Sequence, residues 1–200
     1  HITEFNGSVA SDFISAAEAL QEQGIKHLII YLRDNPGGGL NEVLSVANTL
    51  IPKGDLIVSI RSKSGDERVY KSEGDERFDM NLVVLVNGYS ASASELLTGA
   101  LKDYKLATIV GTQTFGKGIV QSFYHISENG GWAKMTTDAY YTPNGVCIHG
   151  VGITPDIVVD LPEALKDLSI DLIDPAEDTQ LQAAISVFAQ QASLPAAVNR

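Results

Sequence analysis

The sequence predicts an α/β fold in a single layered domain spanning residues 1–200, and three observations lead to this prediction. Apolar runs rich in β-favouring residues alternate with segments whose apolar residues recur at helical spacing. Turns containing glycine separate them, and the unit of strand, turn and helix occurs twice in succession. With 44% hydrophobic and 20% charged residues, a chain of 200 residues can bury one sizeable core.

The first half of the chain carries both of these units. Ser8 is expected to cap a first helix that ends at Gly24. The nearly continuous apolar run at 27–32 predicts a buried strand, which enters a glycine-rich turn at 33–39. The elements expected next are a helix at 40–47, a strand at 56–60, a polar stretch at 61–77, a strand at 82–86 and a helix through 96–101.

The second half predicts a strand at 106–110 and then a β-hairpin. The hairpin strands are expected at 119–126 and 132–141, with the turn at Asn129-Gly130-Gly131. The run Asp174-Pro175-Ala176-Glu177 has the form of a capping box with proline at the first helical position, which predicts a helix beginning there. Its expected core residues are Leu181, Ala184, Ile185 and Phe188, and the residues from 193 onward are expected to fray.

Composition excludes several classes of function. The formal net charge is −11 and no segment concentrates Lys and Arg, which argues against binding to nucleic acid or to an anionic membrane. The single cysteine, Cys147, excludes an intramolecular disulfide. No apolar run approaches the roughly 20 residues needed to span a bilayer. Because the chain begins at His1 without an initiator methionine, it is expected to be a fragment of a longer protein.

A run of small residues, Ser90-Ala91-Ser92-Ala93-Ser94-Glu95, carries the first chemical signal. The strand at 82–86 should deliver Ser92 to the start of a helix, where unpaired N–H groups and a partial positive charge suit a developing oxyanion. This placement favours Ser92 as a nucleophile. The structural explanation is that these serines only cap the helix, because serine is a preferred capping residue.

Lys117 lies between two glycines further along the chain and supplies a candidate base. A lysine can take the proton of a serine hydroxyl if its surroundings hold it neutral, and Phe115, Ile119 and Val120 are expected to form its apolar walls. Gln121 could hydrogen-bond the amine and hold it toward Ser92. The structural explanation is an exposed loop lysine.

An acyl-transfer site also needs donors for the oxyanion. The amide of Ala93 is one candidate, and the glycine turn, at the end of another strand, offers Gly37 and Gly38. That turn could equally be only a tight connection between a strand and a helix.

Two other motifs in the sequence compete with this dyad. Residues 111–117 match the first seven positions of a phosphate-binding loop, but Gly118 replaces the magnesium-binding hydroxyl and a strand follows where the motif requires a helix. Ser92, Asp103 and His125 could form a triad, although His125 lies within an alternating strand. No spacing typical of metal ligands occurs, so neither a metal nor another cofactor is expected.

Four stretches of the sequence resemble the C-terminal processing peptidases, also called tail-specific proteases. The stretches are residues 32–40, 86–101, 110–121 and 141–156, and the resemblance covers about residues 1–160. It implies a crotonase-like core of the ClpP/crotonase type and a Ser-Lys dyad. In that dyad Ser92 is the nucleophile, Lys117 the general base and Gln121 the residue that positions the lysine, and the amides of Gly38 and Ala93 form the oxyanion hole.

The resemblance implies a serine endopeptidase that cuts proteins near an accessible C-terminal tail, outside the cytoplasm. Two departures stand out. No segment matches the PDZ domain that these proteins usually carry, and His149 lies where an amide side chain is common. Residues 161–200 match no family motif and are expected to form an acidic linker and a helix on or beside the core, which could serve a homo-oligomer. The alternatives are a non-catalytic or gated peptide-binding domain on the same fold, and acyl-thioester chemistry.

Overall fold

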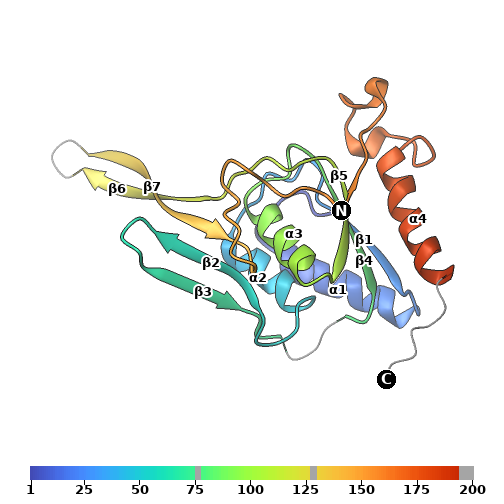
Figure 1. The fold of residues 1–200 in the computed structure, drawn as a ribbon, viewed down its shortest axis with the longest axis horizontal. Coiled ribbons are helices and arrows are strands. Elements are labelled where there is room, and N and C mark those ends of the chain that lie inside the picture. Colours follow the sequence, from blue (N-terminus) through green and yellow to red (C-terminus); the bar gives the residue numbers. More distant parts are fainter. Residues whose placement is uncertain (75–77, 127–129, 194–200) are drawn as a thin grey trace.

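The protein folds into two sheets with helices packed around the first of them (Figure 1). The structure is a computed structural model and describes residues 1–74, 78–126 and 130–193. The combination of helices with a parallel and an antiparallel sheet confirms the predicted α/β fold. Among the described helices, none is long and apolar enough to cross a membrane.

The first sheet is parallel and forms the centre of the molecule. Its strands are β1 (His27–Tyr31), β4 (Asn81–Val86), β5 (Ala107–Gly111) and β8 (Ile157–Val158), in the spatial order β1-β4-β5-β8. In β4 every residue from Leu82 to Val86 is buried, because helices cover both faces of the sheet. Parallel strands all end at one edge, and the predicted site residues follow the ends of β1, β4 and β5 there.

Helices cover the two faces of this sheet. On one face lie α1 (Val9–Glu22), α2 (Leu40–Asn48) and α3 (Ala93–Asp103), which pack against Leu82, Val84 and Val86 in the larger core cluster. On the other face α4 (Thr179–Ser193) packs through Ala184 and Val187. The core is therefore divided by the sheet, and α4 buries the face that the other helices leave open.

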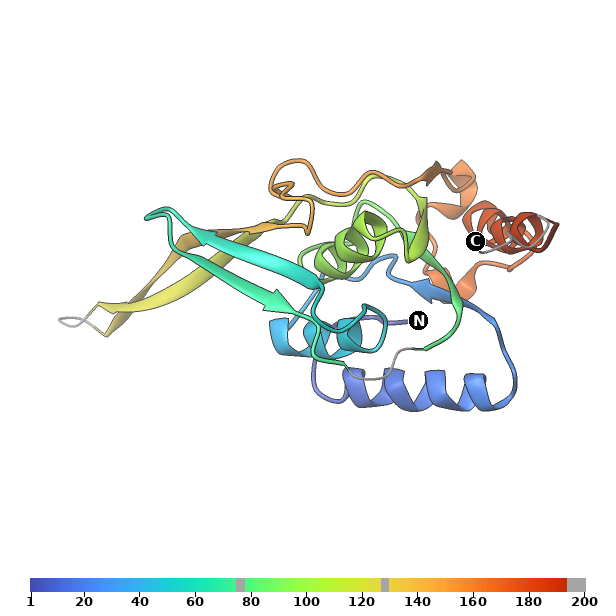
Figure 2. The same ribbon diagram turned by 60° about the horizontal axis from the view of Figure 1, so that its bottom comes forward.

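The second sheet is antiparallel and extends away from the core. Its order is β3-β2-β7-β6, from β2 (Leu56–Ser62), β3 (Glu67–Lys71), β6 (Ile119–Ile126) and β7 (Gly131–Tyr141). Figure 2 shows both of its hairpins projecting from the side of the molecule opposite α4. Several large apolar residues of the β6-β7 hairpin are exposed, namely Phe123, Tyr124, Ile126, Trp132 and Met135.

Two predictions about elements were wrong, and one short strand was not predicted. The polar stretch at 61–77 contains β3, which its antiparallel pairing with β2 stabilises despite its polar sequence. β8 is a strand of two residues, fixed by parallel pairing with β5. The last helix begins at Thr179, because Asp178 accepts the Leu181 amide at 3.0 Å, whereas the Asp174 carboxylate closes a local turn to the Ala176 amide.

Smaller differences concern single side chains. Ile185 was expected in the core but is 47% exposed, since Val187 faces the sheet instead. The Ser8 hydroxyl precedes α1 but donates to the Asp12 carboxylate rather than capping a helix amide. The hairpin turn was expected at 129–131, and Asn129 lies outside the described residues.

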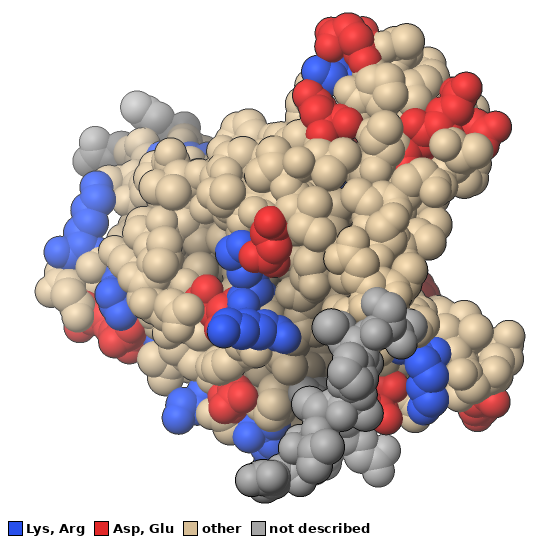
Figure 3. Space-filling model, turned by 45° about the vertical axis from the view of Figure 1, so that its right-hand side comes forward, with Lys and Arg blue, Asp and Glu red and all other residues tan. Residues whose placement is uncertain are grey.

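Acidic side chains gather on the segment between β8 and α4. In Figure 3 they lie on the topmost part of the molecule, around two short 3-10 helices, Glu163–Leu165 and Ile170–Leu172. The exposed acidic residues of this segment are Asp160, Glu163, Asp167, Asp171, Asp174 and Glu177.

Candidate active site

Three serines lie in the turn between β4 and α3, and the structure separates their roles. Ser90 and Ser94 are fully buried. The Ser90 hydroxyl donates to the Leu32 carbonyl at 2.7 Å, and the Ser94 hydroxyl donates to the Asn35 carbonyl at 3.0 Å. Both serines therefore bind the turn to the segment that follows β1. Ser92 is the partly exposed serine of the three, so its hydroxyl is the one that a substrate can reach.

Ser92 also has an unusual backbone conformation. It precedes the first residue of α3 with φ 53° and ψ −115°. A non-glycine residue with positive φ is strained, at a cost of about 1–3 kcal/mol, and such residues concentrate at functional sites. The conformation places a serine on a sharp turn between a strand and a helix, as in the nucleophile elbow of α/β-hydrolases.

The glycine turn after β1 lies directly against Ser92. Gly37 has φ 106° and Gly38 has φ 142°, a region that favours glycine. A methyl group on Gly37 would lie 2.8 Å from the Ser92 Cβ and 2.9 Å from the Ala93 nitrogen. Only glycine lets the backbone at position 37 come this close to Ser92 and Ala93. The glycine turn and the start of α3, which are predicted to supply the oxyanion hole, therefore lie side by side.

The hydrogen bonds of the glycine turn leave one amide free. The Gly37 amide donates to the Asn35 carboxamide oxygen at 2.8 Å, and the Gly39 amide donates to the Phe5 carbonyl at 2.6 Å. Among the described residues, the intervening Gly38 amide has no partner. It is therefore available as a donor beside Ser92.

Glu95 links the serine segment to the lysine segment. Its carboxylate is fully buried. One oxygen accepts the backbone amides of Ser92 at 2.9 Å and of Lys117 at 2.8 Å. The other accepts the Thr114 hydroxyl at 2.6 Å and the Gly116 amide at 2.7 Å. A single side chain thus holds both predicted catalytic segments by their backbones. Sequence reasoning missed this role, although Ser92-x-x-Glu95 matches the capping-box pattern.

Lys117 lies just before β6 and is exposed. It lines an open, largely apolar pocket of about 450 Å³. The other residues around this pocket are Asp34, Pro36, Tyr89, Ala91 and Phe115. Phe115 lines this pocket beside Lys117 as expected, but it is 65% exposed. Ile119 and Val120 are only partly buried and do not line the pocket, so the lysine is not enclosed by apolar walls.

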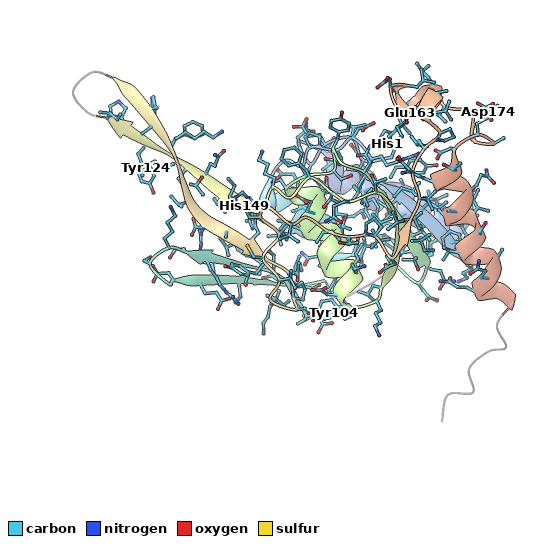
Figure 4. All side chains as sticks on the ribbon, turned by 45° about the horizontal axis from the view of Figure 1, so that its top comes forward. His1, Tyr104, Tyr124, His149, Glu163 and Asp174 are labelled. Carbon is cyan, nitrogen blue, oxygen red and sulfur yellow. The ribbon has the colours of Figure 1, made fainter. Side chains whose placement is uncertain are left out.

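Gln121 and His149 both lie close to the lysine segment along the backbone, Gln121 four positions after Lys117 in β6 and His149 beside Gly118. Gln121 is an exposed residue of β6 at a register shift of the β6-β7 ladder, and no hydrogen bond from its side chain to Lys117 is found among the described residues. Figure 4 shows His149 near the base of the hairpin and Tyr124 on its outer part. A methyl group on Gly118 would lie 2.3 Å from the His149 nitrogen, so the backbone of His149 packs against the lysine segment.

The alternative motifs are not assembled. Asp103 is at the far end of α3 from Ser92, about 15 Å along the helix axis. Its carboxylate accepts the Asn144 amide, while His125 lies on the hairpin with its ring against Trp132. The segment at 111–117 leads into strand β6 and not into the helix that a phosphate-binding loop requires. Among the described residues, no group of three or more His, Cys, Asp or Glu is placed to hold a metal ion.

Comparison with known proteins gives consistent matches. The sequence profile described as Peptidase family S41 matches residues 1–159. The chain is 40% identical over 178 residues to a "Carboxy-terminal-processing protease" of Bartonella bacilliformis, covering 86% of this chain and 41% of that protein. It is 41% identical over 165 residues to a "Probable CtpA-like serine protease" of Staphylococcus epidermidis, covering 81% of this chain and 33% of the relative.

A solved structure agrees with these relatives. The photosystem II D1 C-terminal processing protease is 36% identical with a TM-score of 0.76, and the match covers 80% of this chain and 42% of that one. The chain therefore spans well under half the length of each of these three relatives. The profile match extends over most of the chain and includes every predicted site residue. On this evidence the chain belongs to peptidase family S41.

Proposed function

We propose that this chain is the catalytic core of a serine endopeptidase that cuts protein substrates near their C-termini. The observation that carries the proposal is the turn at Ser92, where the one accessible serine of the run lies in a strained conformation against the glycine turn. Family membership supports the same chemistry, since two of the relatives are named as C-terminal processing proteases.

In the proposed mechanism Lys117 removes the proton from Ser92 as the serine oxygen attacks the carbonyl carbon of the scissile peptide. The amides of Ala93 and Gly38 stabilise the oxyanion of the tetrahedral intermediate. The lysine then gives its proton to the leaving amine. Water, deprotonated by the same lysine, releases the acyl group and restores the serine.

Because Lys117 is exposed in the free protein, the substrate itself would have to shield this lysine from water. A base lysine must be neutral, and removal of water favours the neutral form. Because the pocket beside Lys117 is open and largely apolar, an apolar substrate side chain seated there would cover the lysine. We propose that the substrates present short apolar tails for this reason, and that Gln121 orients the amine once it is covered.

The test is an intact-mass time course on a loosely folded protein with an apolar C-terminal tail. The parent chain is compared with Ser92→Ala, Lys117→Ala and the control Lys105→Ala, which changes another exposed lysine. Cleavage by the parent and the control alone is expected. Cleavage that persists in Ser92→Ala would refute the nucleophile. Binding of the tail without cleavage by any of the four would favour a gated or non-catalytic peptide-binding domain.

Three further proposals concern the full-length protein. We propose that the full-length protein works outside the cytoplasm, that it contains a PDZ domain in addition to this chain, and that it forms a homo-oligomer. The fact that the matches cover 33% to 42% of these relatives supports the presence of a further domain. Sequencing of the complete reading frame, a fusion reporter for export, and light scattering of the purified full-length protein test these proposals.

A further inference from the structure

Arg33 is the largest polar side chain in the core, and it lies at the start of the glycine turn. It lies two residues after the end of β1 and is 0% exposed. Buried arginine is rare unless its charge is paired. Its guanidinium lies 5.0 Å from the ring of Tyr31, and burial raises the pKa of the Tyr31 hydroxyl, so this ring is neutral at physiological pH. The counterion must therefore come from elsewhere.

The counterion comes from the C-terminal segment. The Asp178 carboxylate binds the guanidinium through two hydrogen bonds of 3.0 and 2.6 Å, and the Gln180 side-chain oxygen accepts a third at 3.0 Å. Both residues are almost fully buried. A forked pair of this kind is among the strongest and most directional contacts that arginine makes. Both partners lie outside residues 1–159, which match the family profile.

The segment that carries these partners is itself fixed to the sheet. The side-chain amide nitrogen of Gln180 donates to the Val159 carbonyl just after β8, and the Thr179 hydroxyl donates to the Asp160 carbonyl, both at 2.8 Å. Asp178 also accepts the Leu181 amide and so begins α4. One carboxylate therefore starts the helix and holds Arg33.

Arg33 is connected to the oxyanion donors through very few residues. Asn35 lies two positions further on, and its carboxamide oxygen accepts the Gly37 amide. The Asn35 carbonyl accepts the Ala91 amide at 3.0 Å from the serine turn. A buried guanidinium without its counterion is strongly destabilised, so we expect the segment that carries Arg33 to shift toward water. Because Arg33 is the first residue of the turn, that movement would displace Gly38.

We infer that Asp178 and Gln180 are positioning residues of this active site: through Arg33 they hold the glycine turn, and with it the Gly38 amide, at the distance that an oxyanion requires. The inference rests on the proposed function. On this inference the C-terminal segment, which lies outside the family match, supports the geometry of the catalytic site.

Asp178→Asn separates the two roles of this residue. Asparagine caps a helix about as well as aspartate does, so α4 keeps its start while Arg33 loses the negative charge. The matched control is Asp160→Asn, which removes an exposed ion pair with Lys166 in the same segment. In Asp178→Asn we expect kcat on the tail substrate to fall at least about tenfold with KM within about twofold, because oxyanion donors act in the transition state.

Hydrogen exchange supplies a readout that does not need activity. In Asp178→Asn the backbone amides of residues 33–39 are expected to exchange faster than in the parent, while the amides of β4 exchange at the parent rate. In the control Asp160→Asn, the amides of residues 33–39 and of β4 should both exchange at the parent rate. Unchanged exchange at 33–39 overturns the inference, and so does equal acceleration in β4, which would indicate general loosening. If the parent cleaves nothing, the proposed function fails and the exchange result alone still decides the inference.

A second variant covers the case in which Asp178→Asn does not fold. Gln180→Leu leaves the Arg33–Asp178 pair intact and removes the third hydrogen bond together with the link to Val159. The same pattern, with a smaller fall in kcat of about threefold, is expected. A rise in KM with kcat unchanged would overturn the inference, because it would place Gln180 in substrate binding.

Discussion

The serine half of the site and the lysine half are built in different ways. Ser92 lies on a turn whose neighbouring serines are buried and bonded to the end of β1. Lys117 is exposed and precedes a hairpin that projects away from the core. The serine is fixed by the packing of the central sheet, whereas the lysine backbone is held by the Glu95 carboxylate. The difference supports the proposal that the nucleophile is preorganised and that an apolar substrate covers the base.

Removing Glu95 is expected to have the largest effect, because it breaks the connection between the halves. Glu95→Ala would leave four donors without their acceptor and lower the free energy of unfolding by about 4 kcal/mol. The milder Glu95→Gln should fold and lose about 100-fold in kcat, since it cannot accept all four. Urea denaturation and steady-state kinetics measure both effects. Glu163→Gln is the exposed control, and equal kinetics in the two glutamine variants would contradict the prediction.

Gly37→Ala tests how closely the glycine turn must approach the serine. The new methyl would meet the Ala91 oxygen at 2.7 Å, in a conformation with φ 106°. We expect a loss of about 2–3 kcal/mol of stability together with loss of activity. The matched control is Gly145→Ala, where φ is 77° but the Cβ position is open, so only about 1 kcal/mol should be lost. Thermal melting of both variants provides the comparison, and equal losses would show that contact with Ser92 is unimportant.

Ser92→Gly isolates the strain in the serine half. Glycine tolerates the positive φ of this position, and it is nearly as good as serine at a helix N-cap. The variant should therefore be inactive yet more stable than the parent by about 0.5–1 kcal/mol. The midpoint of chemical denaturation measures this change. A less stable variant would mean that the serine conformation stores no strain.

Trp132→Ala is expected to have the smallest effect on stability. Trp132 is 64% exposed on the hairpin, so its removal should change the free energy of unfolding by less than about 0.5 kcal/mol. Leu97→Ala, in the buried core of α3, should cost about 3 kcal/mol in the same assay. A comparable loss in both would show that the hairpin is part of the cooperative core, and would weaken the contrast between the two halves.

Local pattern was sufficient for most of the fold. The spacing of apolar residues and the positions of glycines predict α1, α2, β1, β4 and β5, because these patterns reflect interactions between residues close in sequence. β3 and β8 were missed because their stability comes from pairing with distant strands and not from their own residues. The start of α4 was misplaced because two acidic residues competed for the cap, and Asp178 had a buried arginine to bind.

The sequence by itself determined the identity of the candidate site: a serine after a buried strand, a glycine-flanked lysine, and a glycine turn after a neighbouring strand. These signals are local, and each arises from the conformation or chemistry of a few adjacent residues. Only the tertiary structure decided that Glu95 joins the two halves, that Lys117 is exposed, and that Arg33 meets Asp178 across 145 positions of sequence. Burial and charge pairing depend on which segments meet in space, and no short stretch of sequence carries that information.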